Sequence, residues 1–125
     1  MCILLYNHIF AAIIFFNCDS MLRESVISAI KDVAVNSIPK GTQVILFGSQ
    51  ARGDARADSD WDLLVVVDKD KLLPEDYDNI TYPLTTLGWD LGVDINPIMY
   101  TQKEWNANSI TPFYYNVNKE GVRIV

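Results

Sequence analysis

Hydrophobic residues recur at helical spacing in the segment that begins at Leu22. The positions that share one face are Leu22, Val26, Ile30 and Val33. Charged residues such as Lys31 occupy the other faces, a pattern typical of a helix that buries one side. Pro39-Lys40-Gly41 follows and is expected to end this helix.

Apolar runs farther along the chain predict strands rather than helices. They cover residues 44–47, 60–68 and 93–100, and residues 122–125 are a candidate for a short fourth strand. The run within 60–68 becomes continuously apolar, which indicates a strand buried on both faces in its second half. Pro97 cannot donate a ladder hydrogen bond, so one edge of its strand should be unpaired there.

Further helices are predicted between and after these strands. They cover residues 50–56, residues 75–91 with a kink or break at Pro83, and the segments after the capping box Thr101-Gln102-Lys103-Glu104 and the pair Thr111-Pro112. The alternation of helices and strands predicts an α/β domain, built on one sheet that the helices cover. The order and direction of the strands do not follow from the pattern.

Composition narrows the class of protein. The 125 residues are 50% hydrophobic, enough for one domain with a real core. The formal net charge of −6 disfavours a protein that grips nucleic acid non-specifically, and no specific nucleic acid is expected as a partner. Cys2 and Cys18 form neither a disulfide framework nor a zinc pattern, which favours a reducing, cytoplasmic setting. The single histidine, His8, has no evident partner for catalysis.

The first twenty residues differ from the rest of the chain. Residues 9–16 are all apolar, yet no basic segment precedes them and no cleavage site typical of a signal peptide follows. The run is also too short to span a membrane, so no membrane partner is expected. We hypothesise that translation starts at Met21, which would make residues 1–20 an upstream extension and 21–125 the domain. If the extension is present, it should be a weakly anchored helix or strand, or a tail that touches a membrane.

Three aspartates are candidates for metal chemistry. Asp60 and Asp62 are two apart on a predicted strand and should share one face, with Trp61 turned into the core. Two adjacent carboxylates repel each other, and magnesium, which prefers oxygen ligands, would remove that conflict. Asp94 lies between Val93 and Ile95 and could complete a site for two ions about 3.5–4 Å apart.

The pair Gly48-Ser49 follows a predicted buried strand and precedes a predicted helix. Glycine allows close backbone approach, and free N–H groups at a helix start attract phosphate. The Ser49 hydroxyl adds a donor, and a role of Ser49 as a simple helix N-cap is compatible with that function. Arg52 is a candidate contact for a triphosphate, or else a solvated charge. The segment lacks the Gly-Lys-Ser/Thr ending of a Walker A loop.

Taken together, Gly48-Ser49-Gln50-Ala51-Arg52-Gly53 and Ser59-Asp60-Trp61-Asp62-Leu63-Leu64-Val65 resemble the signature of the minimal nucleotidyltransferases, members of the DNA-polymerase-beta-like superfamily. The resemblance implies a mixed-sheet palm (α+β-like), magnesium dependence and use of ATP or another NTP. It assigns Ser49 to the β/γ-phosphates, Asp60 and Asp62 to the metals, and Asp94 to a third ligand and base for the acceptor hydroxyl. Gln50 replaces a frequent Arg and Trp61 a frequent Ile; neither change removes a ligand.

Minimal proteins of this kind are commonly the antitoxins of HEPN–nucleotidyltransferase pairs, where they resemble adenylyltransferases that modify a tyrosine of the toxin. The resemblance therefore implies transfer of AMP to a HEPN-domain partner. Two alternatives stay open: an antitoxin that acts by contact without catalysis, and a transferase that modifies small molecules as aminoglycoside nucleotidyltransferases do. The second would require a partner subunit or an oligomer, because so short a domain has little surface to enclose an acceptor.

Overall fold

One sheet of four strands organises the protein in the computed structural model, which describes residues 8–56 and 58–125. The strand order is β3-β2-β1-β4, formed by β1 (Gln43–Phe47), β2 (Trp61–Val67), β3 (Ile95–Thr101) and β4 (Val122–Arg123). β1 is antiparallel to β2 and β4, whereas β2 and β3 are parallel. The predicted α/β domain with a mixed sheet is confirmed, and β3 is an edge strand, as Pro97 indicated.

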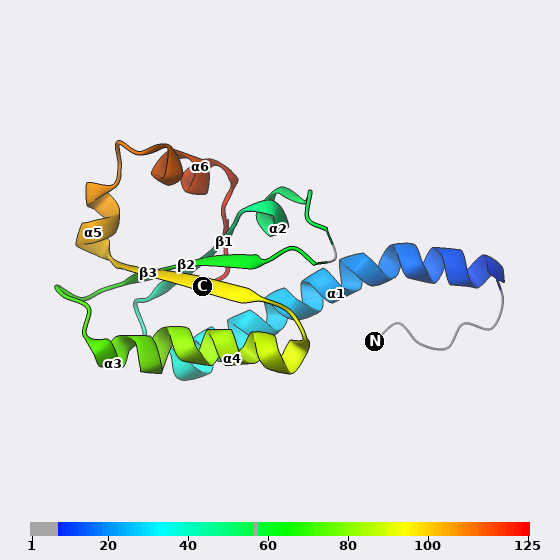
Figure 1. Cartoon of the computed structure of the whole chain (residues 1–125), viewed down its shortest axis with the longest axis horizontal. Helices are drawn as coiled ribbons and strands as arrows, with labels where there is room; N and C mark the ends of the chain where they lie inside the picture. Colours follow the sequence, from blue (N-terminus) through cyan, green and yellow to red (C-terminus); the bar gives the residue numbers. More distant parts are fainter. Residues whose placement is uncertain (1–7, 57) are drawn as a thin grey trace.

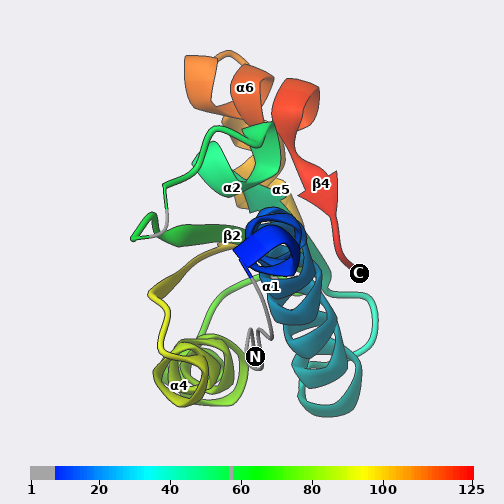
Figure 2. The same ribbon diagram turned by 90° about the vertical axis from the view of Figure 1, so that its right-hand side faces the viewer.

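Helices cover both faces of the sheet (Figures 1 and 2). One face carries α1 (His8–Ser37) and α4 (Tyr82–Leu91); the other carries α5 (Gln102–Ala107) and α6 (Pro112–Glu120). The short α2 (Ser49–Arg52) follows β1 directly. The first turns of α1 extend beyond the end of the sheet in Figure 1.

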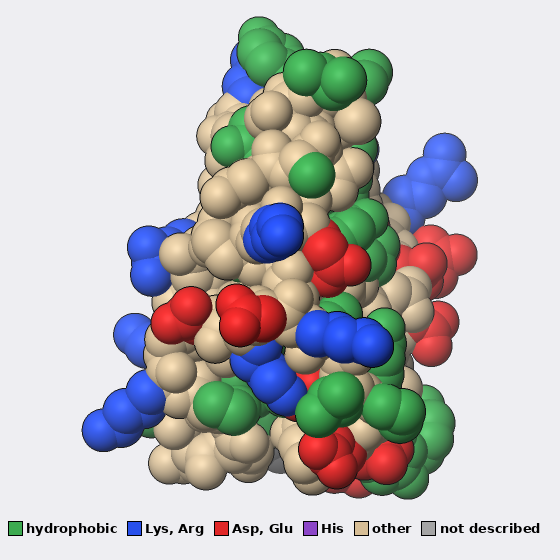
Figure 3. Space-filling view, turned by 90° about the vertical axis from the view of Figure 1, so that its left-hand side faces the viewer, with side chains coloured by type: hydrophobic (Ala, Val, Ile, Leu, Met, Phe, Trp, Pro, Cys, Tyr) green, Lys and Arg blue, Asp and Glu red, His purple; other side chains and the backbone are tan. Residues whose placement is uncertain are grey.

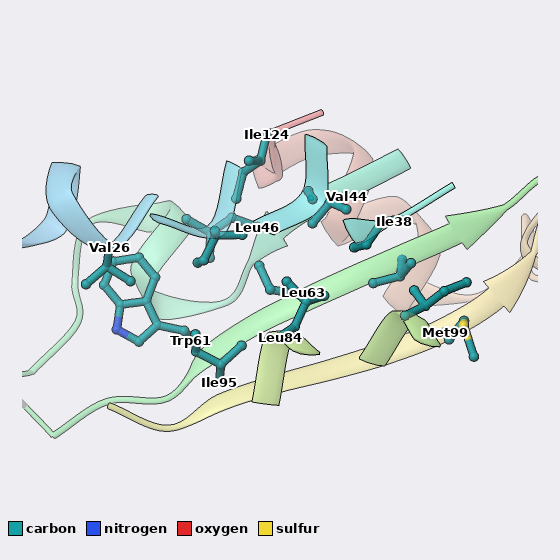
Figure 4. Close-up of a cluster of buried hydrophobic side chains, with 14 of the residues drawn as sticks. Val26, Ile38, Val44, Leu46, Trp61, Leu63, Leu84, Ile95, Met99 and Ile124 are labelled. Carbon is teal, nitrogen blue, oxygen red and sulfur yellow. The ribbon is translucent and has the colours of Figure 1, made fainter. Parts of the chain in front are cut away.

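The larger core lies between the sheet and the pair α1 and α4. Val26 and Ile30 of α1 meet alternate residues of the central strands, among them Leu46 and Leu63, and Figure 4 shows Trp61 turned toward Val26. Trp61 is only 4% exposed, as the alternation in this strand predicted. Full burial of each such side chain contributes about 1.5–3 kcal/mol relative to exposure.

A smaller aromatic core fills the opposite face under α5 and α6. Trp105 lies at its centre, and its ring is 5.6 Å from that of Phe113 and 4.8 Å from that of Tyr114. Leu64 and Val66 of β2 point into this core, so the second half of β2 is buried on both faces, as predicted.

Helix ends follow the capping signals in the sequence. Thr101 Oγ1 accepts a hydrogen bond from the Glu104 backbone N–H at 3.1 Å. Glu104 Oε1 in turn accepts one from the Thr101 backbone N–H at 2.9 Å, which confirms the capping box. Thr111 likewise caps α6 through the Tyr114 N–H.

The predicted break at Pro83 is confirmed, with a detail that the sequence did not indicate. α3 (Pro74–Asp76) leads into η1 (Tyr77–Thr81), a π-helical turn, and only then into α4. Proline has no N–H and disrupts regular helix bonding, so a local change of helix type before it is a physically reasonable response.

Several predicted boundaries were wrong. β2 begins at Trp61 rather than residue 60, so Asp60 precedes the strand. α2 ends at Arg52 rather than residue 56, because Gly53 adopts a left-handed conformation with φ 84° that terminates the helix. β3 begins at Ile95, so Asp94 precedes the strand. α1 begins at His8, well before Leu22.

The hypothesis of an upstream extension over residues 1–20 stays a prediction; residues 1–7, Cys2 included, lie outside the described residues. Among the helices that the described residues form, none combines the length and apolar composition needed to cross a bilayer.

At the end of the molecule where β2 leads into α3 and β3 into α5, acidic and basic side chains are interspersed (Figure 3). Within this region the Lys69 ammonium donates to both carboxylate oxygens of Asp76 at 2.8 Å, and the Leu73 N–H donates to Asp76 Oδ2 at 2.7 Å. These bonds hold the pKa of Asp76 below its ordinary value, and those from Lys69 contribute most. They fasten α3 to the connection that leaves β2.

Candidate functional site

Asp62 stands at the centre of the candidate site. It is the second residue of β2 and pairs in register with Phe47 of β1 and Asn96 of β3. Because side chains alternate along a strand, Asp62 points to the α5/α6 face while Trp61 enters the larger core. The side chain is partly buried, and β2 therefore presents one carboxylate from the middle of the sheet.

Asp60 lies just before β2 and is exposed. Burial raises the pKa of the Asp62 carboxyl above its ordinary value, the negative charge of Asp60 raises it further, and Arg52 opposes both effects. The two carboxylates are thus close enough to repel each other, as their spacing in the sequence predicted. A cation at this point would stabilise the ionised form of both groups.

Gly48 lies against the Asp62 side chain. Its φ is 75°, and a Cβ built on it would be 2.5 Å from Asp62 Oδ2. Any larger residue would therefore be strained in its backbone and would displace the carboxylate. The glycine brings the bend after β1 into direct contact with the candidate metal ligand.

The bend continues into α2 and leaves backbone donors at its start. The N–H groups of Ala51 and Arg52 donate to the Gly48 carbonyl at 3.1 Å, so those of Ser49 and Gln50 precede the first bond within the helix. Gly48 occupies the N-cap position and Ser49 is the first helical residue, so the interpretation of Ser49 as a simple N-cap was wrong. Its hydroxyl stays a candidate phosphate donor.

Arg52, at the end of α2, is held by two carboxylates. Its Nε is 3.2 Å from Asp54 Oδ2, and its Nη1 is 3.5 Å from Glu120 Oε2 at the end of α6. Hydrogen bonding to Asp54, with smaller contributions from Glu120, raises the pKa of Arg52. Since Arg52 also acts on the pKa of Asp62, its positive charge lies within electrostatic reach of the site.

Asp94 lies on the other side of β2, at the start of β3. Its carbonyl accepts from the Trp61 N–H at 2.8 Å, which fixes the backbone of Asp94 beside that of β2. Its exposed side chain lines a cavity of about 440 Å³ together with Ser59 and Trp89. Within residues 8–56 and 58–125, no three acidic, histidine or cysteine side chains are grouped as a metal site. The structure brings Asp60 and Asp62 together, and the role of Asp94 as third ligand stays a prediction.

Behind the bend, Gln50 ties three segments together. It is buried; its Nε2 donates to the Ser59 carbonyl at 3.4 Å, and its own carbonyl accepts from Arg23 Nε and Nη2 at 3.2 and 3.0 Å. Arg23 belongs to α1, so this helix supports the bend from outside the sheet. This residue, which replaces a frequent Arg in the family pattern, therefore has a structural role here.

Sequence reasoning did not single out Glu120, Asn116 or Trp89, all of which border the site. Asn116 and Glu120 line a second cavity, of about 430 Å³, on the Gly48 side of Asp62. They are four residues apart on one helix, which places them on one face. Nothing in the local sequence indicates that this face meets Arg52, because the contact depends on the tertiary fold.

Comparison with known proteins agrees with the fold. Residues 27–115 match the family model described as a nucleotidyltransferase domain. The chain is 36% identical over 105 residues to the Methanocaldococcus jannaschii protein named "Putative protein adenylyltransferase MJ0604", covering 84% of this chain and 95% of that protein. A solved toxin–antitoxin structure with AMP-PNP has the same fold, with a TM-score of 0.58 and 21% identity over 79% of this chain and 72% of the other.

Proposed function

Since the chain belongs to the nucleotidyltransferase domain family, we propose that it transfers AMP from ATP to a tyrosine hydroxyl of a HEPN-domain partner protein. The observation that carries the proposal is the contact between Gly48 and Asp62, which sets the bend after β1, our proposed phosphate site, directly against a carboxylate. The name of the M. jannaschii relative supports adenylyl transfer to protein. The structural neighbour, a toxin–antitoxin structure with AMP-PNP, supports a protein partner and an adenine nucleotide.

The residues present fit a divalent cation. Asp60 and Asp62 offer carboxylate oxygens, the donors that magnesium prefers, and burial, followed by the negative charge of Asp60, raises the pKa of Asp62. We propose that these two residues hold the metal, with Asp94 as third ligand, and that two magnesium ions bind. When bound, the metal supplies positive charge that offsets the negative charge of the reacting phosphates.

The residues of the bend would bind and orient the triphosphate. The N–H groups of Ser49 and Gln50, the Ser49 hydroxyl and the Arg52 guanidinium supply donors and positive charge for the β- and γ-phosphates. Asp94 takes the proton of the acceptor hydroxyl. The acceptor oxygen then bonds to the α-phosphorus, the bond from that phosphorus to the bridging oxygen breaks, and pyrophosphate leaves. Positioning and charge stabilisation carry the catalysis.

The proposal is tested with Asp62→Asn, which keeps the shape of the side chain and removes its charge. Purified protein is incubated with α-labelled ATP, magnesium and the product of the adjacent gene. Label should appear on a partner tyrosine with the wild type and fall by at least about 100-fold with the variant, because a metal ligand is lost. Asp70→Asn, an exposed acid on the connection after β2, is the matched control and should transfer normally.

The same variants separate catalysis from simple contact. If the wild type labels no partner, or if Asp62→Asn labels it at the wild-type rate, the proposed activity is wrong. If the wild type labels nothing and still neutralises the partner, the protein is a binding module on this fold. Circular dichroism of the variants excludes unfolding as the cause of any loss.

A further inference from the structure

The cavity on the Gly48 side of Asp62 adjoins the phosphate-binding bend. It opens between the end of β1 and one face of α6, and Gly48 and Arg52 form part of its wall. Its volume of about 430 Å³ is within the range of sites that enclose a small organic molecule. Gly48 lines this cavity and also touches Asp62, so a ligand that fills it lies next to the candidate catalytic carboxylate.

One wall of the cavity is aromatic. The rings of Phe47 and Phe113 pack edge to face, with centroids 5.4 Å apart and an interplanar angle of 68°. Both residues are only partly buried, so apolar ring surface is left toward the cavity. Flat heterocycles stack on such surfaces whatever their hydrogen-bonding pattern. This wall suits the plane of a nucleobase and does not by itself choose among bases.

The polar part of the lining comes from the same face of α6 as Phe113. Asn116 offers an amide with both a donor and an acceptor, and Glu120 offers a carboxylate that only accepts. Glu120 Oε2 pairs with Arg52 at 3.5 Å, which leaves Oε1 to face another donor. An accepting carboxylate beside an amide favours a base with an exocyclic amino group, since Asn pairs with the amino and N7 edge of adenine.

The position of Glu120 is fixed by the residue that follows it. A Cβ on Gly121 would lie 2.4 Å from the Val117 carbonyl oxygen and 2.8 Å from Ile45 Cγ2, so the end of α6 packs directly on β1. β4 starts at once afterwards and pairs with β1 at Val122. The backbone next to Glu120 is therefore held by the sheet, and Arg52 holds its carboxylate.

We propose that this cavity binds the base and ribose of the nucleotide, and that Asn116 and Glu120 select adenine through its 6-amino group. The inference rests on the proposed function and adds to it the residues that choose the nucleotide. Arg52, between the cavity and Asp62, then contacts the phosphates of the same molecule.

The test compares ATP with inosine triphosphate, which carries a carbonyl in place of the 6-amino group. Binding of each nucleotide with magnesium is measured by calorimetry, and transfer by kcat/KM, for the wild type, Asn116→Ala and Glu120→Gln. The wild type should prefer ATP by about tenfold. Asn116→Ala should reduce the preference, and Glu120→Gln, whose amide donates to a carbonyl, should abolish or reverse it.

The readout is the ratio of affinity, and of kcat/KM, for ATP over that for inosine triphosphate. Effects of a substitution that are common to both nucleotides cancel in this ratio. Glu120→Gln also breaks the contact with Arg52, but that change acts on the triphosphate common to both nucleotides. Asn118→Ala, an exposed amide on the same helix that does not line the cavity, is the matched control and should keep the wild-type ratio.

The failure of this inference can be distinguished from the failure of the proposed function. If the wild type transfers AMP but shows no preference, or if its preference survives in Asn116→Ala and Glu120→Gln, the cavity does not read the base and only this inference is overturned. If the wild type binds and transfers neither nucleotide, the proposed function fails together with it.

Discussion

The two sides of β2 differ in how firmly they present the candidate site. On the β1 side, Gly48 touches Asp62 so closely that no Cβ fits, and Gln50 ties the bend to α1. On the β3 side, Asp94 is joined to β2 through its backbone while its side chain is exposed, and the neighbouring Trp89 is 66% exposed. The β1 side of the site is formed by close backbone contact, and the β3 side is formed by exposed side chains.

The proposed function gives the two sides different tasks. A phosphate group is the same in every nucleoside triphosphate, and a rigid backbone cradle suits it because the donors need no rearrangement. An acceptor on another protein has its own shape, and an open cavity with an exposed aromatic ring suits a contact that the partner completes. Substitutions on the β1 side should therefore cost more than substitutions on the β3 side.

Gly48→Ala should have the largest effect. The new Cβ would displace the Asp62 carboxylate, and a misplacement of this size lowers transfer by about 100-fold. The backbone of Gly48, with φ 75° and ψ −158°, lies in a region open almost only to glycine, which adds a loss of stability of about 1–3 kcal/mol. Transfer assays and denaturant titrations measure the two effects separately.

Gly53→Ala is the control for backbone strain. Its φ of 84° is similar, yet a Cβ there meets nothing within 4 Å. Its ψ of 10° places Gly53 in the left-handed helical region, where a Cβ costs about 1–2 kcal/mol, so the variant should lose somewhat less stability than Gly48→Ala and keep most of its transfer activity. An equal loss of transfer in both variants would show that strain, and not the contact with Asp62, is responsible.

Asp94→Asn should have a smaller overall effect than Gly48→Ala, because a similar loss of transfer comes without the loss of stability. Loss of the proposed base should lower kcat by about 100-fold, the low end for a general base, with little change in the affinity for ATP. Transfer assays quenched at timed intervals measure kcat, and calorimetry measures the affinity for ATP. Asp90→Asn, an exposed acid nearby on α4, is the control. A loss of ATP affinity as large as the loss of kcat would show that Asp94 acts on the nucleotide rather than on the acceptor hydroxyl.

Asp76→Asn should have the smallest effect on transfer, because it lies at the other end of β2. Since the pKa of Asp76 is lowered in the folded state, its stabilising contribution is present above the unfolded pKa and is lost as pH falls through the folded value. The variant should therefore be less stable than the wild type at neutral pH, and the difference should shrink in acid. Thermal unfolding from pH 7 to pH 3 checks this; a difference independent of pH would contradict it.

Local patterns predicted those features that depend on neighbours in the chain. The alternation around Trp61 placed Asp60 and Asp62 away from the core, and Pro97 indicated the edge strand, because strand geometry and proline chemistry act over a few residues. The resemblance to the family supplied the mixed sheet, which periodicity alone could not.

Other features depended on contacts between distant segments. The approach of Gly48 to Asp62 is a consequence of the register between β1 and β2, and the pairing of Arg52 with Glu120 joins residues far apart in sequence. Neither contact produces a periodic pattern in the sequence. The length of α2 was missed because a glycine within a helical pattern is tolerated in one context and ends the helix in another.

The pairing of β1 with β4 has a consequence for synthesis on the ribosome. Val44 exchanges backbone bonds with Ile124 and Val125, and Ile45 pairs with Arg123, so β1 gains its second neighbour only after residues 122–125 have left the exit tunnel. Until then one edge of the strand that carries Gly48 has unpaired backbone groups, a hazard for misassembly in a nascent chain. The bend at Gly48 would then reach its finished form only after helices α1 to α6 have been made.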